Sequence, residues 1–84
     1  LAALRTATAN VHSAQAQMET ARLDCESKKV LLAEAVISDY DYLLAENALA
    51  VAEANVEQAK AQEQTAERQQ AVFEEKTRSQ GMSV

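Results

Sequence analysis

Proline is absent from this sequence and its single glycine is Gly81, so almost no residue disfavours a helix. Three aromatic residues and no tryptophan leave few large side chains from which a globular core could be built. Eighteen of the 84 residues are alanine, which has the highest helix propensity but buries little apolar surface. Together with the many Glu, Gln, Lys, Arg and Leu residues, this composition is typical of coiled coils and long helices.

The scarcity of cysteine and of positive charge excludes further classes of protein. A lone cysteine, Cys25, cannot form an intramolecular disulfide, and we interpret it as a small buried hydrophobic residue and not as a reactive thiol. The net charge of −5 argues against nucleic acid as a partner, because no basic face exists to neutralise phosphates. The longest apolar runs, such as residues 30–33, are too short to span a bilayer. No signal peptide is visible and the chain begins without methionine, so we expect a segment of a larger protein.

The helical pattern is interrupted once, near the middle of the chain. Ser38 is suited to be the N-cap of a second helix, and Asp41 stands three positions later, where a carboxylate completes a capping box. Ile37 and Tyr42 then occupy the two positions of a hydrophobic staple. A helix that stops and restarts without a linker is expected to fold back on itself. We predict a first arm at residues 1–34, a tip at 35–38 and a second arm at 39–79.

The residues after the second arm are expected to form a tail at residues 80–84. Lys76 and Arg78 place positive charge in a final helical turn, and Gly81 is predicted to stop the helix. A weak similarity between residues 26–32 and 67–73 leaves open a second hairpin beyond this one.

Apolar side chains recur in both arms with the alternating spacing of three and four residues that indicates coiled-coil packing. Lys28 is the departure from this seam in the first arm, and Glu63 and Gln70 are the departures in the second. The seam positions of the first arm are Leu4, Ala7, Val11, Ala14, Met18, Ala21, Cys25, Lys28 and Leu32. Those of the second arm are Tyr42, Ala45, Leu49, Ala52, Val56, Ala59, Glu63, Ala66, Gln70 and Phe73.

The two seams match each other when the chain is folded antiparallel about Ile37. Large side chains then face large ones and alanines face alanines, so the backbones can approach closely. The predicted pairs are Leu32–Tyr42, Cys25–Leu49, Met18–Val56, Val11–Glu63, Ala21–Ala52, Ala14–Ala59 and Ala7–Ala66. We therefore predict an all-α fold, an antiparallel two-helix coiled-coil hairpin, with paired arms about 50 Å long. Such a narrow seam is marginally stable alone, so we expect further contacts in the parent protein.

The sequence offers no catalytic or metal-binding constellation, and we expect no enzyme activity, metal or cofactor. His12 is the only histidine, and no Cys or His stands at ligand spacing from it. Asp39 and Asp41 flank the predicted cap, where a helix N-terminus favours negative charge. Tyr40 is expected to face outward at the tip, where with Ile37 it would suit docking to another protein. The staple explains Ile37 equally well.

Residues 31–41, followed by Ala45-Glu46-Asn47-Ala48-Leu49 and alanine-rich heptads, resemble the α-hairpin of periplasmic adaptor proteins. These are also called membrane fusion proteins, of the HlyD and RND-efflux adaptor type. The tip motif of that family is Arg, Leu and Ser with three and six residues intervening. Leu31 and Ser38 match its last two positions, whereas Ser27 stands at the arginine position with Lys28 beside it. The resemblance covers roughly residues 1–73.

The resemblance implies a periplasmic rod whose tip docks to an outer-membrane TolC-like channel. The parent protein would be anchored to the inner membrane and reach an inner-membrane transporter through parts outside this segment, and several copies would associate into a ring. The chain would then belong to a tripartite efflux pump or a type I secretion system. The expected partner-binding residues are Leu31, Val36, Ile37, Ser38 and Tyr40.

A different class of function is also compatible with the pattern. The hairpin could be a structural or dimerising antiparallel coiled coil of another protein, for example one that pairs into a four-helix bundle. Apolar outer positions such as Ala9, Ala16, Ala48 and Val51 permit either ring packing or bundling.

Overall fold

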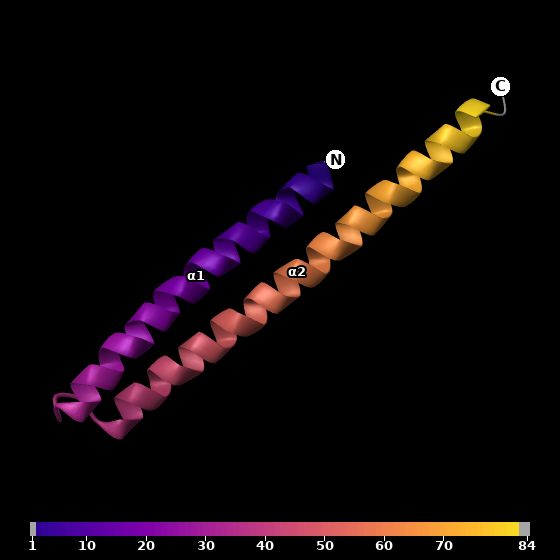
Figure 1. Ribbon diagram of the computed structural model, residues 1–84. Coiled ribbons are helices and arrows are strands. Elements are labelled where there is room, and N and C mark those ends of the chain that lie inside the picture. Colours follow the sequence, from indigo (N-terminus) through magenta and orange to yellow (C-terminus); the bar gives the residue numbers. More distant parts are fainter. Residues whose placement is uncertain (1, 83–84) are drawn as a thin grey trace.

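The computed structural model describes residues 2–82, which form two helices joined by a short turn (Figure 1). Helix α1 spans Ala2–Ala33 and helix α2 spans Asp39–Met82. The two helices lie side by side, run in opposite directions and pack against each other (Figure 1). The predicted all-α, two-helix hairpin is therefore confirmed.

The molecule is a thin rod with dimensions of 74 × 14 × 12 Å. It is longer than the predicted paired length because α2 has 44 residues and α1 has 32, so α2 continues past the start of α1 (Figure 1). Neither helix, within the described part of the chain, combines the length and the apolar character that crossing a membrane requires.

The burial of side chains follows the predicted seam. Every predicted position of the first arm, from Leu4 to Leu32, is buried or half-buried, and so is every position of the second arm from Tyr42 to Gln70. The buried residues among those that the structure describes are Ala7, Val11, Ala14, Cys25, Ala45, Ala52, Val56 and Ala59. Most of them are alanines, so the two backbones are close and each residue removes little apolar area from water.

One cluster of buried side chains contains both of the buried valines. Val11 and Val56 are 6% and 4% exposed, and they cluster with Ala14, Ala59 and the partly buried Met18. This cluster contains the predicted Met18–Val56 and Ala14–Ala59 pairs. Burying a valine contributes on the order of 1.5–2 kcal/mol, whereas the single methyl of alanine contributes less than about 1 kcal/mol.

The polar residues of the seam are accommodated at its edge. The ammonium group of half-buried Lys28 donates to Asp24 Oδ2 at 3.0 Å on the same helix. Gln70 donates through Nε2 to Glu74 at 3.2 Å, but its buried Oε1 has no hydrogen-bond partner among the described residues. An unsatisfied buried amide oxygen destabilises the packing around it. The end of the seam far from the turn is therefore its less stable end.

One predicted burial state and one predicted boundary of the second arm are wrong. Phe73 is 68% exposed, because the register places it opposite position 1 and the described part of α1 begins at Ala2. Helix α2 includes Gly81 and ends at Met82, so the predicted arm end at 79 and tail start at 80 are incorrect. A single glycine costs a helix only about 1 kcal/mol, which is too little to end it without a competing cap. Residues 83 and 84 of the predicted tail lie outside the described residues.

Ion pairs do not determine how the two helices are aligned. Among the described residues, every ion pair joins side chains three or four positions apart on one helix. Arg22 contacts both Glu19 and Glu26, the latter at 2.7 Å, and its guanidinium lowers the pKa of the Glu19 carboxyl. Such exposed pairs within a helix contribute only a few tenths of a kcal/mol. The register therefore depends on the seam and on the turn.

Tyr42 titrates differently from a tyrosine in water. Its removal from water raises the pKa of its hydroxyl, and the neighbouring Cys25 thiol and Glu46 carboxylate raise it further. A raised pKa means that the folded hairpin favours the neutral phenol over the phenolate. The resulting stabilisation is present below the unfolded-state pKa of about 10 and is lost as the pH rises through the folded-state pKa.

We expect the Tyr42→Phe variant to lose less stability than the wild type between about pH 9.5 and pH 11.5, because no phenolate can form in its seam. Denaturant midpoints followed by circular dichroism across this range measure the effect. Tyr40→Phe is the matched control, because it removes a phenol that is 66% exposed. Identical pH profiles for wild type and Tyr42→Phe would contradict the prediction.

Candidate functional site: the tip of the hairpin

The tip consists of the last turn of α1, the turn at residues 34–38 and the first two turns of α2. It is the end of the rod at which the chain reverses (Figure 1). All five predicted partner-binding residues lie in it. Its geometry is determined by how one helix ends and how the next begins.

Helix α1 ends in a Schellman motif. Ala35 adopts the left-handed conformation, with φ of 60°. Its N–H donates to the carbonyl of Leu32 at 3.0 Å, and the N–H of Val36 donates to the carbonyl of Leu31 at 2.9 Å. Glycine is the usual residue at this position because a Cβ atom costs about 1–2 kcal/mol there. The first helix therefore ends with backbone strain at Ala35.

Helix α2 begins with the predicted capping box. The N–H of Asp41 donates to Ser38 Oγ at 3.2 Å, and the N–H of Ser38 donates to Asp41 Oδ2 at 3.4 Å. The carbonyl of Ser38 accepts from the N–H of Tyr42 at 3.2 Å, which starts the helix. An N-cap serine stabilises a helix by about 1 kcal/mol relative to alanine. Ile37 and Tyr42 are both half-buried, as a hydrophobic staple between them requires.

The predicted partner-binding residues divide into two groups. Val36 and Tyr40 are 64% and 66% exposed, so their apolar surface is available to a partner. Leu31 and Ile37 are half-buried, and the carbonyl of Leu31 holds the Schellman motif. Ser38 is exposed, but its hydroxyl oxygen already accepts the cap bond, which leaves its O–H to donate.

Other exposed apolar residues at this end were not predicted. Val30, Leu43 and Leu44 are 57%, 50% and 49% exposed. The sequence could have identified these residues. All three are apolar, lie close to the predicted turn and do not belong to the seam, so they could be expected to be exposed there. Here "exposed tip residues" denotes these three together with Val36 and Tyr40.

Each helix also carries a second uncharged stripe, on the face opposite the seam. The stripe of α1 consists of Ala2, Thr6, Ala9, Ser13, Ala16, Thr20, Leu23, Ser27 and Val30. The stripe of α2 consists of Tyr40, Leu44, Asn47, Val51, Ala54, Gln58, Ala61 and Thr65. Every one of these residues is exposed and none is charged, although a quarter of the chain is charged. Apart from Lys28 and Glu63 in the seam, the charged residues that flank these stripes lie between the seam and the outer faces, and the α2 stripe ends where Arg68 follows at the same spacing.

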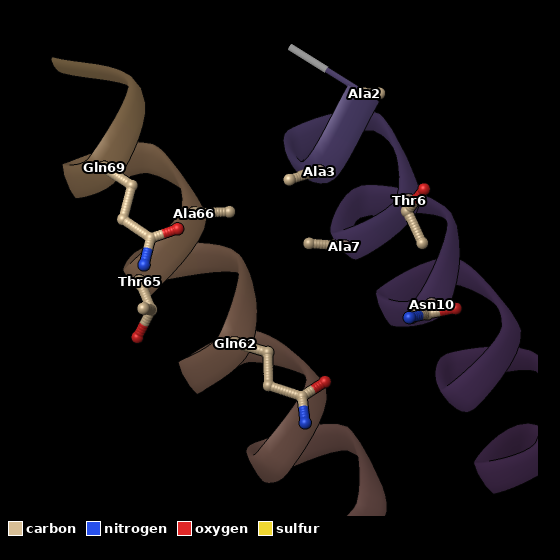
Figure 2. Close-up of a pocket in the computed structure, with 9 residues that line it drawn as sticks. All are labelled: Ala2, Ala3, Thr6, Ala7, Asn10, Gln62, Thr65, Ala66 and Gln69. Carbon is tan, nitrogen blue, oxygen red and sulfur yellow. The ribbon is translucent and has the colours of Figure 1, made fainter. Parts of the chain in front are cut away.

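A groove lies between the helices at the open end of the hairpin. Figure 2 shows Ala3 and Ala7 of α1 and Ala66 of α2 directed toward each other across it. Thr, Asn and Gln side chains form the rest of its wall, so no side chain lining it can ionise. Among the residues that the structure describes, no cluster of His, Cys, Asp or Glu is arranged to hold a metal ion. The groove is therefore lined by small apolar and uncharged polar side chains.

Comparison of this chain with known protein families, with characterised proteins and with solved structures finds no match. The resemblance to periplasmic adaptors therefore depends on the tip residues and the heptads alone.

We expect Ala35→Gly to raise the free energy of unfolding by about 0.5–1 kcal/mol. Glycine removes the strain of the left-handed conformation, and the greater entropy of the unfolded chain offsets part of that gain. Denaturant titration followed by circular dichroism measures the change. Ala48→Gly, in the exposed interior of α2, is the control and should lower stability by about 1 kcal/mol. A loss of stability in Ala35→Gly would contradict the assignment of the motif.

Proposed function

We propose that this chain is the α-hairpin of a periplasmic adaptor subunit, in a tripartite efflux pump or a type I secretion system. Its tip docks to an outer-membrane TolC-like channel. Parts of the protein outside this chain link it to an inner-membrane transporter and anchor it to the inner membrane. The observation that carries the proposal is the concentration of exposed apolar side chains at a doubly capped turn, at the end of a 74 Å rod.

Of the two residues that match the adaptor tip motif, Ser38 shapes the turn through its side chain, whereas Leu31 contributes its backbone carbonyl. Leu31 accepts the closing hydrogen bond of the Schellman motif, and Ser38 caps the second helix. Both therefore help to present Val36 and Tyr40, which supply the exposed apolar surface. The arginine position of the motif is Ser27, so this tip docks without a positive charge there.

Self-association into a ring is part of the proposal. A tip only about 14 Å wide can offer a small contact per copy, well below the area of a stable interface. Several copies held together would bind with a far higher effective affinity than one. The uncharged outer stripes on opposite sides of the hairpin support lateral packing of this kind, since each copy could contact a neighbour on either side.

The outer stripes also favour an alternative function. Two hairpins that bury one stripe each would form a closed four-helix bundle, as in a structural or dimerising coiled coil. The two functions differ in what the tip does. An adaptor needs its exposed tip residues for binding, whereas a bundle needs only its stripes.

We expect Val36→Ser to abolish or strongly reduce export by the parent protein without changing its abundance, because it removes apolar surface from the tip. Val72→Ser is a matched control at the opposite end of the rod, where Val72 is 66% exposed and Val36 is 64% exposed. The control should export normally.

Photo-cross-linking in living cells provides a direct readout of the docking partner. A photoreactive phenylalanine analogue at position 40 is an aromatic replacement for an exposed tyrosine and leaves the capping box intact. It should capture an outer-membrane channel. Capture of no channel, together with normal export by Val36→Ser, would refute the docking function and leave the structural coiled coil.

We expect Leu23→Glu and Val51→Glu to weaken self-association of the chain by at least about tenfold, since each places a charge within an outer stripe. Sedimentation velocity over a range of concentrations measures it, with Gln17→Glu and Gln64→Glu as controls outside the stripes. A larger closed species of more than two chains would favour the ring, and a closed dimer would favour the bundle. A wild-type chain that stays monomeric at about 1 mM would contradict lateral packing.

A further inference from the structure

The exposed tip residues lie in the most negatively charged part of the chain. The stretch from residue 30 to residue 59 contains no lysine or arginine, and four of its acidic residues, Glu34, Asp39, Asp41 and Glu46, lie at the tip. All four of these residues are exposed. The nearest positive charges are Lys28 and Lys29, and Lys28 already pairs with Asp24.

The backbone makes the same end of the rod rich in hydrogen-bond acceptors. The carbonyl oxygens of residues 33–37 accept no hydrogen bond from any described residue. They follow the C-terminal end of α1, where the helix dipole is negative. Of the four tip carboxylates, that of Asp41 accepts a hydrogen bond from the N–H of Ser38, and the other three have no partner among the described residues.

These features together describe an apolar surface surrounded by acceptors and negative charge. Val36 and Tyr40 are 64% and 66% exposed and stand in sequence between the carboxylates. A partner that covers them must remove water from the carboxylates and carbonyls nearby, and this is unfavourable unless donors replace the water. Arginine and lysine provide such donors together with a complementary charge, whereas an acidic partner would be repelled.

We propose that the tip docks to a protein surface with an apolar centre ringed by arginine and lysine side chains. This inference rests on the proposed docking function and adds the chemistry of the partner to it. The apolar centre covers the exposed tip residues, and the basic ring pairs with Glu34, Asp39 and Glu46 and donates to the open carbonyls of the turn.

Selection from a random peptide library displayed on phage tests this chemistry without a known channel. The full wild-type chain is immobilised near its open end and used for the selection. The affinity of the selected peptides for this chain is then compared with their affinity for a variant carrying Glu34→Gln, Asp39→Asn and Glu46→Gln. Asp41 is left unchanged because it completes the capping box. A variant carrying Glu53→Gln, Glu57→Gln and Glu67→Gln removes the same charge from the middle of α2 and is the control.

The expected peptides combine arginine or lysine with aliphatic or aromatic residues. They should bind the tip variant at least about tenfold more weakly than the wild type and bind the control variant equally well. Their binding to the wild type should also weaken steeply as sodium chloride rises from about 0.05 M to about 0.5 M. Circular dichroism checks that both variants remain helical, and the salt dependence needs no variant at all.

The proposal is overturned if the selected peptides show no excess of basic residues, or if they bind the tip variant as tightly as the wild type. A selection that yields no tip-dependent binder overturns it as well. These outcomes are separate from the cross-linking result at position 40. Basic, apolar binders together with no captured channel would mean that another protein with this chemistry is the partner.

Discussion

The reversal between Ala33 and Asp39 is the constraint on which the rest of the hairpin depends. The Schellman motif ends one helix and the capping box begins the next within five residues, so the two seams can meet in only one register. No ion pair between the helices, among the described residues, reinforces that register. A shift along the seam would place alanines opposite large side chains and leave cavities. The turn and the alternation of residue size therefore act together.

The same alternation limits how stable the rod can be. Most buried side chains are alanines, which let the helices approach closely but contribute little hydrophobic stabilisation. Val11 and Val56 lie in one buried cluster with Met18 packed against it, and the unsatisfied oxygen of Gln70 weakens the end far from the turn. A rod of this kind gains from lateral contacts, because its seam alone buries a single narrow strip. The uncharged outer stripes are the surfaces on which such contacts can form.

Much of this architecture can be predicted from the sequence because the signals for it are local or periodic. The cap at Ser38 and Asp41 is a short pattern with a definite geometry, and the seam repeats over nearly every turn of both arms. The left-handed Ala35 could not be predicted, since nothing in an alanine marks it for a conformation that glycine usually adopts. Phe73 was wrongly assigned to the seam because periodicity does not report where the opposing helix begins. Gly81 was read as a stop, although one glycine without a competing cap leaves the helix intact.

The positions of the heptad separate the tasks of the side chains along the rod. Seam positions hold the two helices together, the outer positions from Ala2 to Val30 and from Tyr40 to Thr65 are uncharged, and most charged residues lie between them on the flanks. This separation ends at the tip, where apolar and acidic residues are intermixed and exposed. The capping box uses Asp41, Asp39 lies in the first turn of α2 where the helix N-terminus favours its charge, and the Schellman motif uses only backbone groups. The side chains of Val36, Tyr40, Glu34 and Glu46 make no hydrogen bond or ion pair with a described residue, and binding to another molecule is the role that their chemistry fits.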